Sequence, residues 1–227
     1  MNNRLNRTRL LFGDVGIEKL NNATVMVVGC GAVGSFAIEA LARTGVGHII
    51  VVDFDLVEES NINRQLFAME STIGTPKVDV AAARIHDINP EIRVDAVRTF
   101  WDENTDIAFT PDYIIDAIDT VPSKIALYRW AHAHSIPFIA SMGAASKTDM
   151  TKIKIAKISK TSVCPLAARV RKMVRGTDLP DFPVVFSEQN PATVVGHAKN
   201  LGSIITVTGM FGMMLANWVI QEIVRDI

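Results

Sequence analysis

The stretch VMVVGCGAVG, residues 25–34, joins a short apolar run to a Gly-x-Gly-x-x-Gly loop. A strand that ends in such a loop leads into a helix whose first backbone amides can hold a phosphate group. Gly29, Gly31 and Gly34 therefore predict a nucleotide site at the carboxyl end of the first strand. The loop alone does not choose between NAD, FAD, S-adenosylmethionine and ATP.

The polar residues after the second apolar run, residues 49–52, narrow the choice. They are Asp53, Asp55, Asn61, Arg64 and Lys77. Asp53 is placed to bind a ribose hydroxyl, and Asp55 lies on the same side of an extended chain. Arginine can clamp phosphate oxygens with its planar guanidinium. The set favours a triphosphate whose bond is to be broken over a dinucleotide.

Apolar segments and helical patterns alternate through the first 143 residues. The expected strands are 24–29, 48–53, 92–97, 113–117 and 137–140, and the expected helices are 14–22, 33–44, 76–88 and 122–134. Strands that are apolar along their whole length are typical of a sheet covered on both faces. The pattern predicts an α/β fold, a Rossmann-like, doubly wound and mostly parallel sheet with the ATP site at the carboxyl edge of its strands. Asp119 falls at that edge, where a carboxylate can hold magnesium between phosphates.

The pattern changes after Gly143. Residues 152–158 alternate between basic and apolar side chains, which predicts a strand with one basic, solvated face. Residues 165–175 predict a helix with Met173 among its inward residues and Arg169 and Arg171 outward. Residues 176–200 show no periodicity and predict a loop, whereas 201–224 predict an apolar core or dimer-interface helix rather than a membrane span. We expect one ATP-binding unit over 1–227, with 1–143 as its nucleotide-binding part and 144–227 as the rest.

The charge is unevenly distributed. Nine basic residues and one acidic residue lie between 147 and 175, a net +8, which leaves −9 for the rest of a chain whose total is −1. A basic segment on an acidic body suggests a polyanionic partner, although a solvated basic face would look the same. With two cysteines and no Cys-x-x-Cys pair the chain predicts neither a disulfide framework nor structural zinc, and we expect no signal peptide and a cytoplasmic location.

The combined pattern resembles the ubiquitin-activating-enzyme-like adenylyltransferase superfamily. The resemblance rests on the glycine loop, Asp53-x-Asp55, Asn61-x-x-Arg64-Gln65, Lys77 and Asp116-x-x-Asp119. It implies that the three loop glycines, Asp53 and Asp55 bind ATP, that Asn61, Arg64 and Lys77 contact phosphate, and that Asp119 binds magnesium. It assigns catalytic roles to Arg64, Lys77, Asp119 and Arg7, with Arg7 reaching the partner's ATP site in a homodimer.

Two stretches, 141–147 (SMGAASK) and 158–172 (ISKTSVCPLAARVRK), resemble the tRNA threonylcarbamoyladenosine dehydratase branch of that superfamily. The resemblance implies ATP-dependent activation of the threonyl carboxylate of threonylcarbamoyladenosine in tRNA, followed by ring closure within the nucleoside. The basic segment agrees, because tRNA is a polyanion. The tRNA-contacting residues we expect are Lys147, Lys160, Arg169, Arg171, Lys172 and Arg175.

Three alternatives remain open at this point. One is an adenylyltransferase that activates the carboxyl terminus of a ubiquitin-like sulfur carrier, whose relatives usually carry zinc cysteines. Another is an NAD-dependent oxidoreductase, in which Asn61, Arg64 and Lys77 would have no evident role. The third is a scaffold that accepts sulfur from a sulfur-relay protein through Cys164. His197 could also enter the site from its loop.

Overall fold

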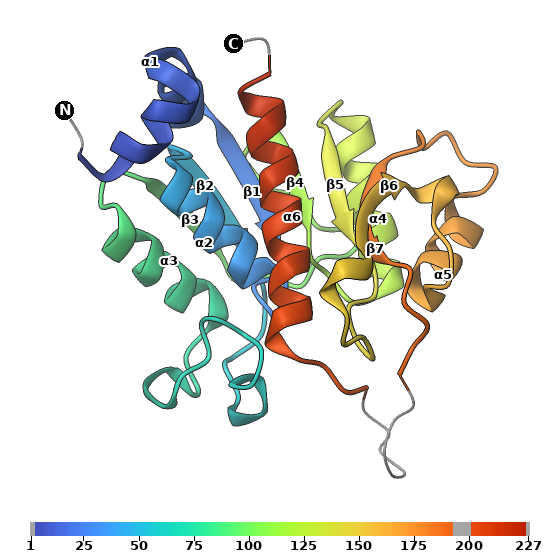
Figure 1. The fold of residues 1–227 in the computed structure, drawn as a ribbon. Coiled ribbons are helices and arrows are strands. Elements are labelled where there is room, and N and C mark those ends of the chain that lie inside the picture. Colours follow the sequence, from blue (N-terminus) through green and yellow to red (C-terminus); the bar gives the residue numbers. More distant parts are fainter. Residues whose placement is uncertain (1–2, 193–200, 226–227) are drawn as a thin grey trace.

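A single seven-stranded sheet organises the chain, whose computed structural model describes residues 3–192 and 201–225 (Figure 1). The strand order is β3-β2-β1-β4-β5-β7-β6. The strands are β1 (Thr24–Val28), β2 (His48–Val52), β3 (Arg93–Val97), β4 (Tyr113–Asp116), β5 (Phe138–Ser141), β6 (Ile153–Lys157) and β7 (Pro183–Ser187). All neighbours pair in parallel except β6 and β7. The order reverses between β1 and β4, and ligands of such sheets bind at this switch point.

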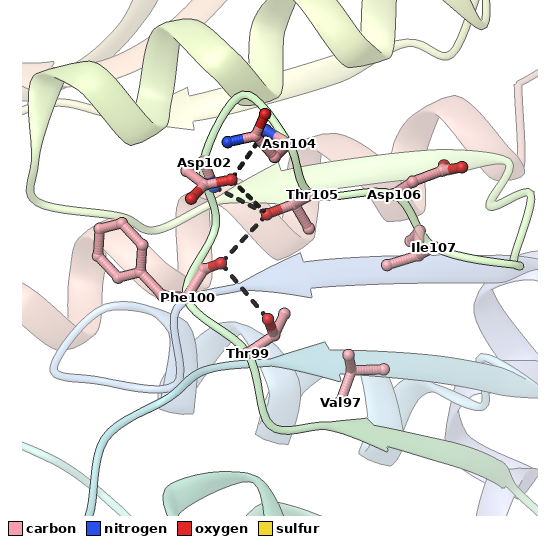
Figure 2. Close-up of a pocket in the computed structure, with 8 residues that line it drawn as sticks. All are labelled: Val97, Thr99, Phe100, Asp102, Asn104, Thr105, Asp106 and Ile107. Atoms are coloured by element: carbon pink, nitrogen blue, oxygen red, sulfur yellow. Dashed lines mark hydrogen bonds between the residues drawn. The ribbon is translucent and has the colours of Figure 1, made fainter.

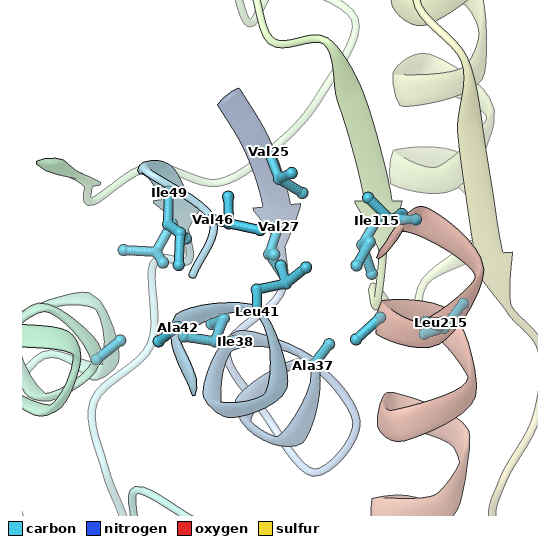
Figure 3. Packing of buried hydrophobic residues seen from close by; sticks show 14 of the residues in the cluster. Val25, Val27, Ala37, Ile38, Leu41, Ala42, Val46, Ile49, Ile115 and Leu215 are labelled. Atoms are coloured by element: carbon cyan, nitrogen blue, oxygen red, sulfur yellow. The ribbon is translucent and has the colours of Figure 1, made fainter. Parts of the chain in front are cut away.

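Helices cover both faces of the sheet (Figure 1). The helices are α1 (Asn6–Asn22), α2 (Gly34–Thr44), α3 (Lys77–Ile88), α4 (Val121–Ala133), α5 (Pro165–Val174) and α6 (Ile205–Ile223). Strand residues alternate between two cores: Val25 and Val27 pack with α2, α3 and α6, whereas Met26 and Val28 pack with α4 and α5. Figure 3 shows the first core between β1, α2 and α6.

The α/β fold class and the mostly parallel sheet are confirmed, and most element bounds agree within two residues. The predicted helix 14–22 is the part of α1 that follows a kink at Gly13. The helix at 201–224 is α6, with one side buried against α2. No helix among residues 3–192 and 201–225 is long and apolar enough to cross a membrane.

Three expectations beyond Gly143 need correction. Residues 176–200 were expected to form a loop, but they contain β7, a buried strand between β5 and β6. Its first residue is Pro183, a position where proline is tolerated in a strand, so the proline-rich composition of the segment hid it. Residues 193–200, including His197, lie outside the described residues.

The other two corrections concern which side chains face inward. In α5 the buried side chains are those of Ala167 and Val170, whereas Met173 is 50% exposed because the helix contacts the core along a narrow stripe. In β6 the predicted alternation breaks at Ala156, which leaves Lys157 on the same face as Ile153 and Ile155. Since β6 is an edge strand, Ile155 remains partly exposed on that face.

Candidate functional site

Two positions of the glycine loop between β1 and α2, Gly29 and Gly34, have no room for a side chain. Gly29 has φ +97°, and a Cβ atom there would lie 2.8 Å from the carbonyl oxygen of Ala117. A Cβ on Gly34 would lie 1.7 Å from the carbonyl oxygen of Gly29. The first turn of α2 carries no acidic side chain, so its positive end is open to an anion. The predicted loop glycines thus form a backbone cradle at the switch point of the sheet.

Asp53 connects this loop to the end of β2. One carboxylate oxygen accepts a hydrogen bond from the backbone N–H of Cys30 at 2.6 Å, and the other accepts one from the N–H of Asp55 at 2.9 Å. Each oxygen has a second lone pair, which is free to accept a ribose hydroxyl. Burial raises the pKa of the Cys30 thiol, and the neighbouring Asp53 carboxylate raises it further. Cys30 is therefore a packing residue of the loop rather than a nucleophile.

Lys77 and Asp55 form an ion pair between the two ends of the long connection after β2. Their Nζ and Oδ2 atoms are 2.7 Å apart, and the Lys77 backbone N–H donates to the Asp55 carbonyl at 3.0 Å. Lys77 is only 5% exposed, whereas the Asp55 carboxylate is half exposed. The pair places a buried cation at the carboxyl end of β2, close enough to Cys30 to act on its thiol.

The connection itself is organised by Asn61. Its backbone carbonyl accepts the N–H groups of Arg64 and Gln65, at 3.0 and 2.9 Å, and its side-chain oxygen accepts that of Glu58. The Gln65 side chain faces Gly31, where a Cβ would be 3.7 Å from its amide nitrogen. Asn61 is buried and builds the loop; the predicted contact between Asn61 and phosphate stays a prediction.

Arg64 belongs to the same turn as Gln65, whose side chain faces the glycine loop. One guanidinium nitrogen donates to the carbonyl of Ser60 at 2.7 Å and to the side chain of Asn63 at 2.8 Å. A guanidinium has five N–H donors, so this contact leaves others for an anion. A contact missed by the sequence reasoning fixes the loop from the other side: the hydroxyl of Ser35 accepts the N–H of Leu66 at 3.2 Å.

Asp119 lies in the turn between β4 and α4, at the same edge of the sheet. It is exposed and makes no hydrogen bond or ion pair with any residue in the described ranges. No cluster of three or more His, Cys, Asp or Glu side chains is found among those residues. A single free carboxylate beside a phosphate cradle fits magnesium, which takes one or two carboxylates together with substrate phosphates and water.

Sequence reasoning named Asp116 but missed Lys124 and Tyr128, the two side chains that hold it. Lys124 forms an ion pair with Asp116 at 2.7 Å, Tyr128 donates to the same carboxylate oxygen at 2.6 Å, and all three side chains are fully buried. Burial raises the pKa of the Tyr128 hydroxyl, and the Asp116 carboxylate adds to that rise. The signal in the sequence was a lysine within an otherwise apolar face of α4.

A hollow of about 410 Å³ lies at the carboxyl end of β3 (Figure 2). It is lined by residues between Val97 and Ile107, and the Thr105 hydroxyl donates to the Phe100 carbonyl to hold the loop in shape. The rings of Phe100 and Phe54 meet edge to face, with centroids 5.0 Å apart. Since Phe54 directly follows Asp53, this half-exposed aromatic pair lies on the β3 side of the ribose-binding position and suits a flat, apolar base.

Arg7 is not brought to this edge within one chain. It is exposed on α1, which lies at the end of the sheet where the strands begin, away from the 54–76 connection (Figure 1). The same helix exposes Leu10 and Leu11, at 77% and 79% of their surface. A role for Arg7 in catalysis therefore requires a second chain.

The basic segment is divided between surface and interior. Of the six residues expected to contact tRNA, the exposed ones are Lys160, Arg169, Lys172 and Arg175. Lys147 is 3% exposed, its amine contacts the Gln189 carbonyl, and burial lowers its pKa, so its expected contact with tRNA stays a prediction that this burial does not support. Arg171 is half-buried because its guanidinium donates to the Thr161 carbonyl at 3.0 Å. The other N–H donors of Arg171 are left over, so its expected contact with tRNA stays a prediction.

Cys164 is the N-cap residue that directly precedes α5, and it is 2% exposed. Its sulfur lies against the backbone of Gly143, where a Cβ would be 3.3 Å from it. A thiol enclosed in this way is not presented to an external sulfur donor. A sulfur-relay role for Cys164 stays a prediction that this burial does not support.

Comparisons with known proteins agree with the site. A model of the ThiF family matches residues 5–226. A tRNA threonylcarbamoyladenosine dehydratase of Bacillus subtilis (strain 168) is 42% identical, over 100% of this chain and 97% of that protein. One from Escherichia coli (strain K12) is 39% identical, over 80% of this chain and 68% of that protein. The crystal structure of E. coli tRNA N6-threonylcarbamoyladenosine dehydratase, TcdA, in complex with ATP superposes with a TM-score of 0.91 at 33% identity, covering 97% of this chain and 93% of that one.

Proposed function

The chain belongs to the ThiF family, and from this membership we propose that it activates the threonyl carboxylate of tRNA-borne threonylcarbamoyladenosine with ATP and closes it to the cyclic form. The observation that carries the proposal is the full-length match to a dehydratase of the same size, together with the close superposition on an ATP-bound relative. The glycine loop and Asp53 supply the nucleotide site in this chain.

ATP can lie along the carboxyl edge of the sheet in one orientation. The ribose hydroxyls contact Asp53, the base lies towards the Phe54–Phe100 pair, and the phosphates run along the glycine loop to the switch point. Arg64 and Lys77 are the cations on one side of the phosphates. Asp119, on the other side, would hold magnesium, which supplies positive charge to neutralise the phosphate oxygens.

The reaction has two steps. A carboxylate oxygen of the substrate attacks the α-phosphorus of ATP, the bond to the bridging oxygen breaks, and pyrophosphate leaves. A nucleophilic atom of the same nucleoside then attacks the acyl carbon and loses a proton, and AMP leaves with the former carboxylate oxygen. The nucleoside thus loses the elements of one water. Arg64 and Lys77 stabilise the charge that develops on the α-phosphate in the first step.

The tRNA contacts are reduced to the exposed part of the basic segment. Lys160, Arg169, Lys172 and Arg175 can neutralise phosphates of the tRNA backbone, and none of them has an acidic partner among the described residues. Because β6 and β7 continue the nucleotide-binding sheet, this surface and the ATP site belong to one continuous structural unit.

The active form is a homodimer. Arg7 is exposed far from its own chain's glycine loop, and neighbouring exposed leucines on α1 need an apolar partner surface. In the dimer Arg7 enters the partner's ATP site and adds a third cation there. This arrangement accounts for a charged residue that serves no site in its own chain.

The test is ATP turnover to AMP and pyrophosphate, with and without tRNA that bears threonylcarbamoyladenosine, followed by mass analysis of the nucleosides. The proposal requires AMP formation that depends on the modified tRNA, with loss of one water from the nucleoside. Exchange between ATP and pyrophosphate that appears only with a protein ending in Gly-Gly would instead assign a sulfur-carrier adenylyltransferase. Tight binding of NAD without ATP turnover would refute adenylation altogether.

A further inference from the structure

A fully buried charge network lies behind the carboxyl ends of β4 and β5. The Asp116 carboxylate accepts from the Lys124 amine at 2.7 Å and from the Tyr128 hydroxyl at 2.6 Å. The same amine donates to the carbonyl of Ser141, at the end of β5, at 2.7 Å. Asp116, Lys124 and Tyr128 have no exposed surface, so the network is sealed from solvent.

Stability alone does not account for such a network. Removing two charges from water opposes folding, and buried ion pairs are often replaced by apolar residues of similar size without loss of stability. What distinguishes this network is geometric. It joins the last residue of β4, the last residue of β5 and the first turns of α4 through one carboxylate and one amine.

The other oxygen of Asp116 determines the shape of the turn that follows. It accepts the backbone N–H of Ile118 at 2.9 Å, directly before Asp119. The preceding residue, Ala117, donates its N–H to Val28 at 2.9 Å, and its carbonyl forms the wall against which Gly29 is packed. The turn therefore carries Asp119 on one side and closes the glycine loop on the other.

We propose that Asp116, Lys124 and Tyr128 are positioning residues for Asp119, which they hold where its carboxylate meets a divalent cation on the ATP phosphates. The inference rests on the proposed function for the identity of the cation and the nucleotide. Asp119 makes no hydrogen bond or ion pair of its own with the described residues, so its position depends on the turn that Asp116 fixes. One oxygen of Asp116 accepts the Ile118 N–H and so holds the turn, while the other accepts the hydrogen bonds of Lys124 and Tyr128.

Tyr128→Phe tests the network with the smallest change. The ring keeps its stacking on Phe138 and Phe182, with centroids at 4.9 and 4.7 Å, and only the hydroxyl that donates to Asp116 is lost. The matched control is Tyr113→Phe, at the beginning of β4, the strand that ends in Asp116, and away from the turn. Lys124→Met is the harsher variant, and it leaves a buried carboxylate without its cation.

Two readouts do not depend on turnover. The first is amide hydrogen exchange at Ile118, which should become about tenfold faster in Tyr128→Phe because its acceptor is less firmly held. The second is the affinity of the protein with a non-hydrolysable ATP analogue for Mn²⁺, measured by electron paramagnetic resonance, which should fall about tenfold. The KM for ATP at saturating Mg²⁺ should change by less than about twofold, and Tyr113→Phe should match the wild type in all three.

A double-mutant cycle separates positioning from general loosening. In an Asp119→Asn background, Tyr128→Phe should cause no further loss of Mn²⁺ affinity, because the group that it positions is gone. An equal loss in both backgrounds, or unchanged exchange at Ile118 in Tyr128→Phe, would overturn the inference. A wild-type protein that binds Mn²⁺ and nucleotide but forms no AMP with modified tRNA would refute the proposed function and leave the positioning result standing.

Discussion

Gly212→Ala should separate α6 from α2 and weaken the nucleotide site with it. A Cβ on Gly212 would lie 2.2 Å from the carbonyl oxygen of Val33 and 2.8 Å from Cβ of Phe36. Carbon and oxygen atoms of neighbouring helices approach to about 3.3 Å, so α6 must retreat by roughly 1 Å. Val33 is the cap residue of α2 and directly precedes the last glycine of the loop. The displacement therefore acts on the phosphate cradle as well as on the core.

The magnitude follows from two opposing terms. Alanine gains about 0.5–1 kcal/mol over glycine inside a helix, whereas overpacking typically costs about 1–3 kcal/mol. Because a backbone carbonyl cannot rotate away, the cost belongs at the upper end, and the net loss should be about 2 kcal/mol. Gly209→Ala is the matched control one turn earlier: its Cβ would be 3.2 Å from the edge of the Phe36 ring, which can adjust.

Urea unfolding of the two variants and the wild type checks the reasoning, with ATP affinity measured on the same samples. We expect Gly209→Ala to lie within about 1 kcal/mol of the wild type, and Gly212→Ala to lose both stability and ATP affinity. Equal stability of the two variants would show that α6 slides freely on α2 and would refute the packing argument. Lost stability with intact ATP affinity would refute only the link between this contact and the cradle.

The remaining predictions address charge, thiol and assembly. Burial alone would raise the pKa of Glu39, but the hydrogen bonds and charges of Arg43 and Arg84 outweigh it and lower that pKa. The contribution of Glu39 to stability is therefore complete above about pH 4.5 and is lost as the pH falls through the lower folded value. The destabilisation caused by Glu39→Gln, measured in urea, should shrink between pH 7 and pH 3. Cys164→Ser should keep the rate of AMP formation within about twofold, and an abolished rate would revive a thiol role. Arg7→Ala and Asp119→Asn should each be inactive alone, yet a mixture refolded together should recover about a quarter of the wild-type rate if sites are shared between subunits.

The sheet could be predicted because β1 and β2 are runs of mostly β-branched residues between turn signals. Alternate residues of Val25–Val28 and Ile49–Val52 pack into the two cores on opposite faces of the sheet. Both faces of these strands are therefore apolar, which is the pattern of a buried parallel strand. The same reasoning failed for β7, because Pro183 and its neighbours in the sequence indicate a loop. The strand forms because β5 and β6 pair with it on its two sides.

The site could be predicted as a set of residues but not as a set of contacts. Asp53 was expected at the nucleotide, and its bonds to the N–H groups of Cys30 and Asp55 are set by how β1 and β2 align. Lys147 was expected to contact tRNA as part of the basic segment, and only the fold reveals that its amine is turned towards the Gln189 carbonyl. Charge in a sequence indicates an anion partner only where the chain leaves that charge at the surface.

Lys77 and Arg64 already have partners within the chain. How exposed those partners are to water decides whether each cation can leave its partner for a phosphate. Lys77 is nearly enclosed, whereas the carboxylate of Asp55 that it contacts is half exposed to water. Transferring the amine to a phosphate would leave a hydrated carboxylate, which loses little, and would give a buried cation a partner of higher charge. Arg64 has the same freedom, because its present partners are a backbone carbonyl and an amide rather than an acid. Asp116 lacks this freedom, because both side chains of its pair with Lys124 are fully buried. Lys77 and Arg64, the cations proposed to bind the nucleotide, can therefore move, whereas the pair proposed to position Asp119 cannot.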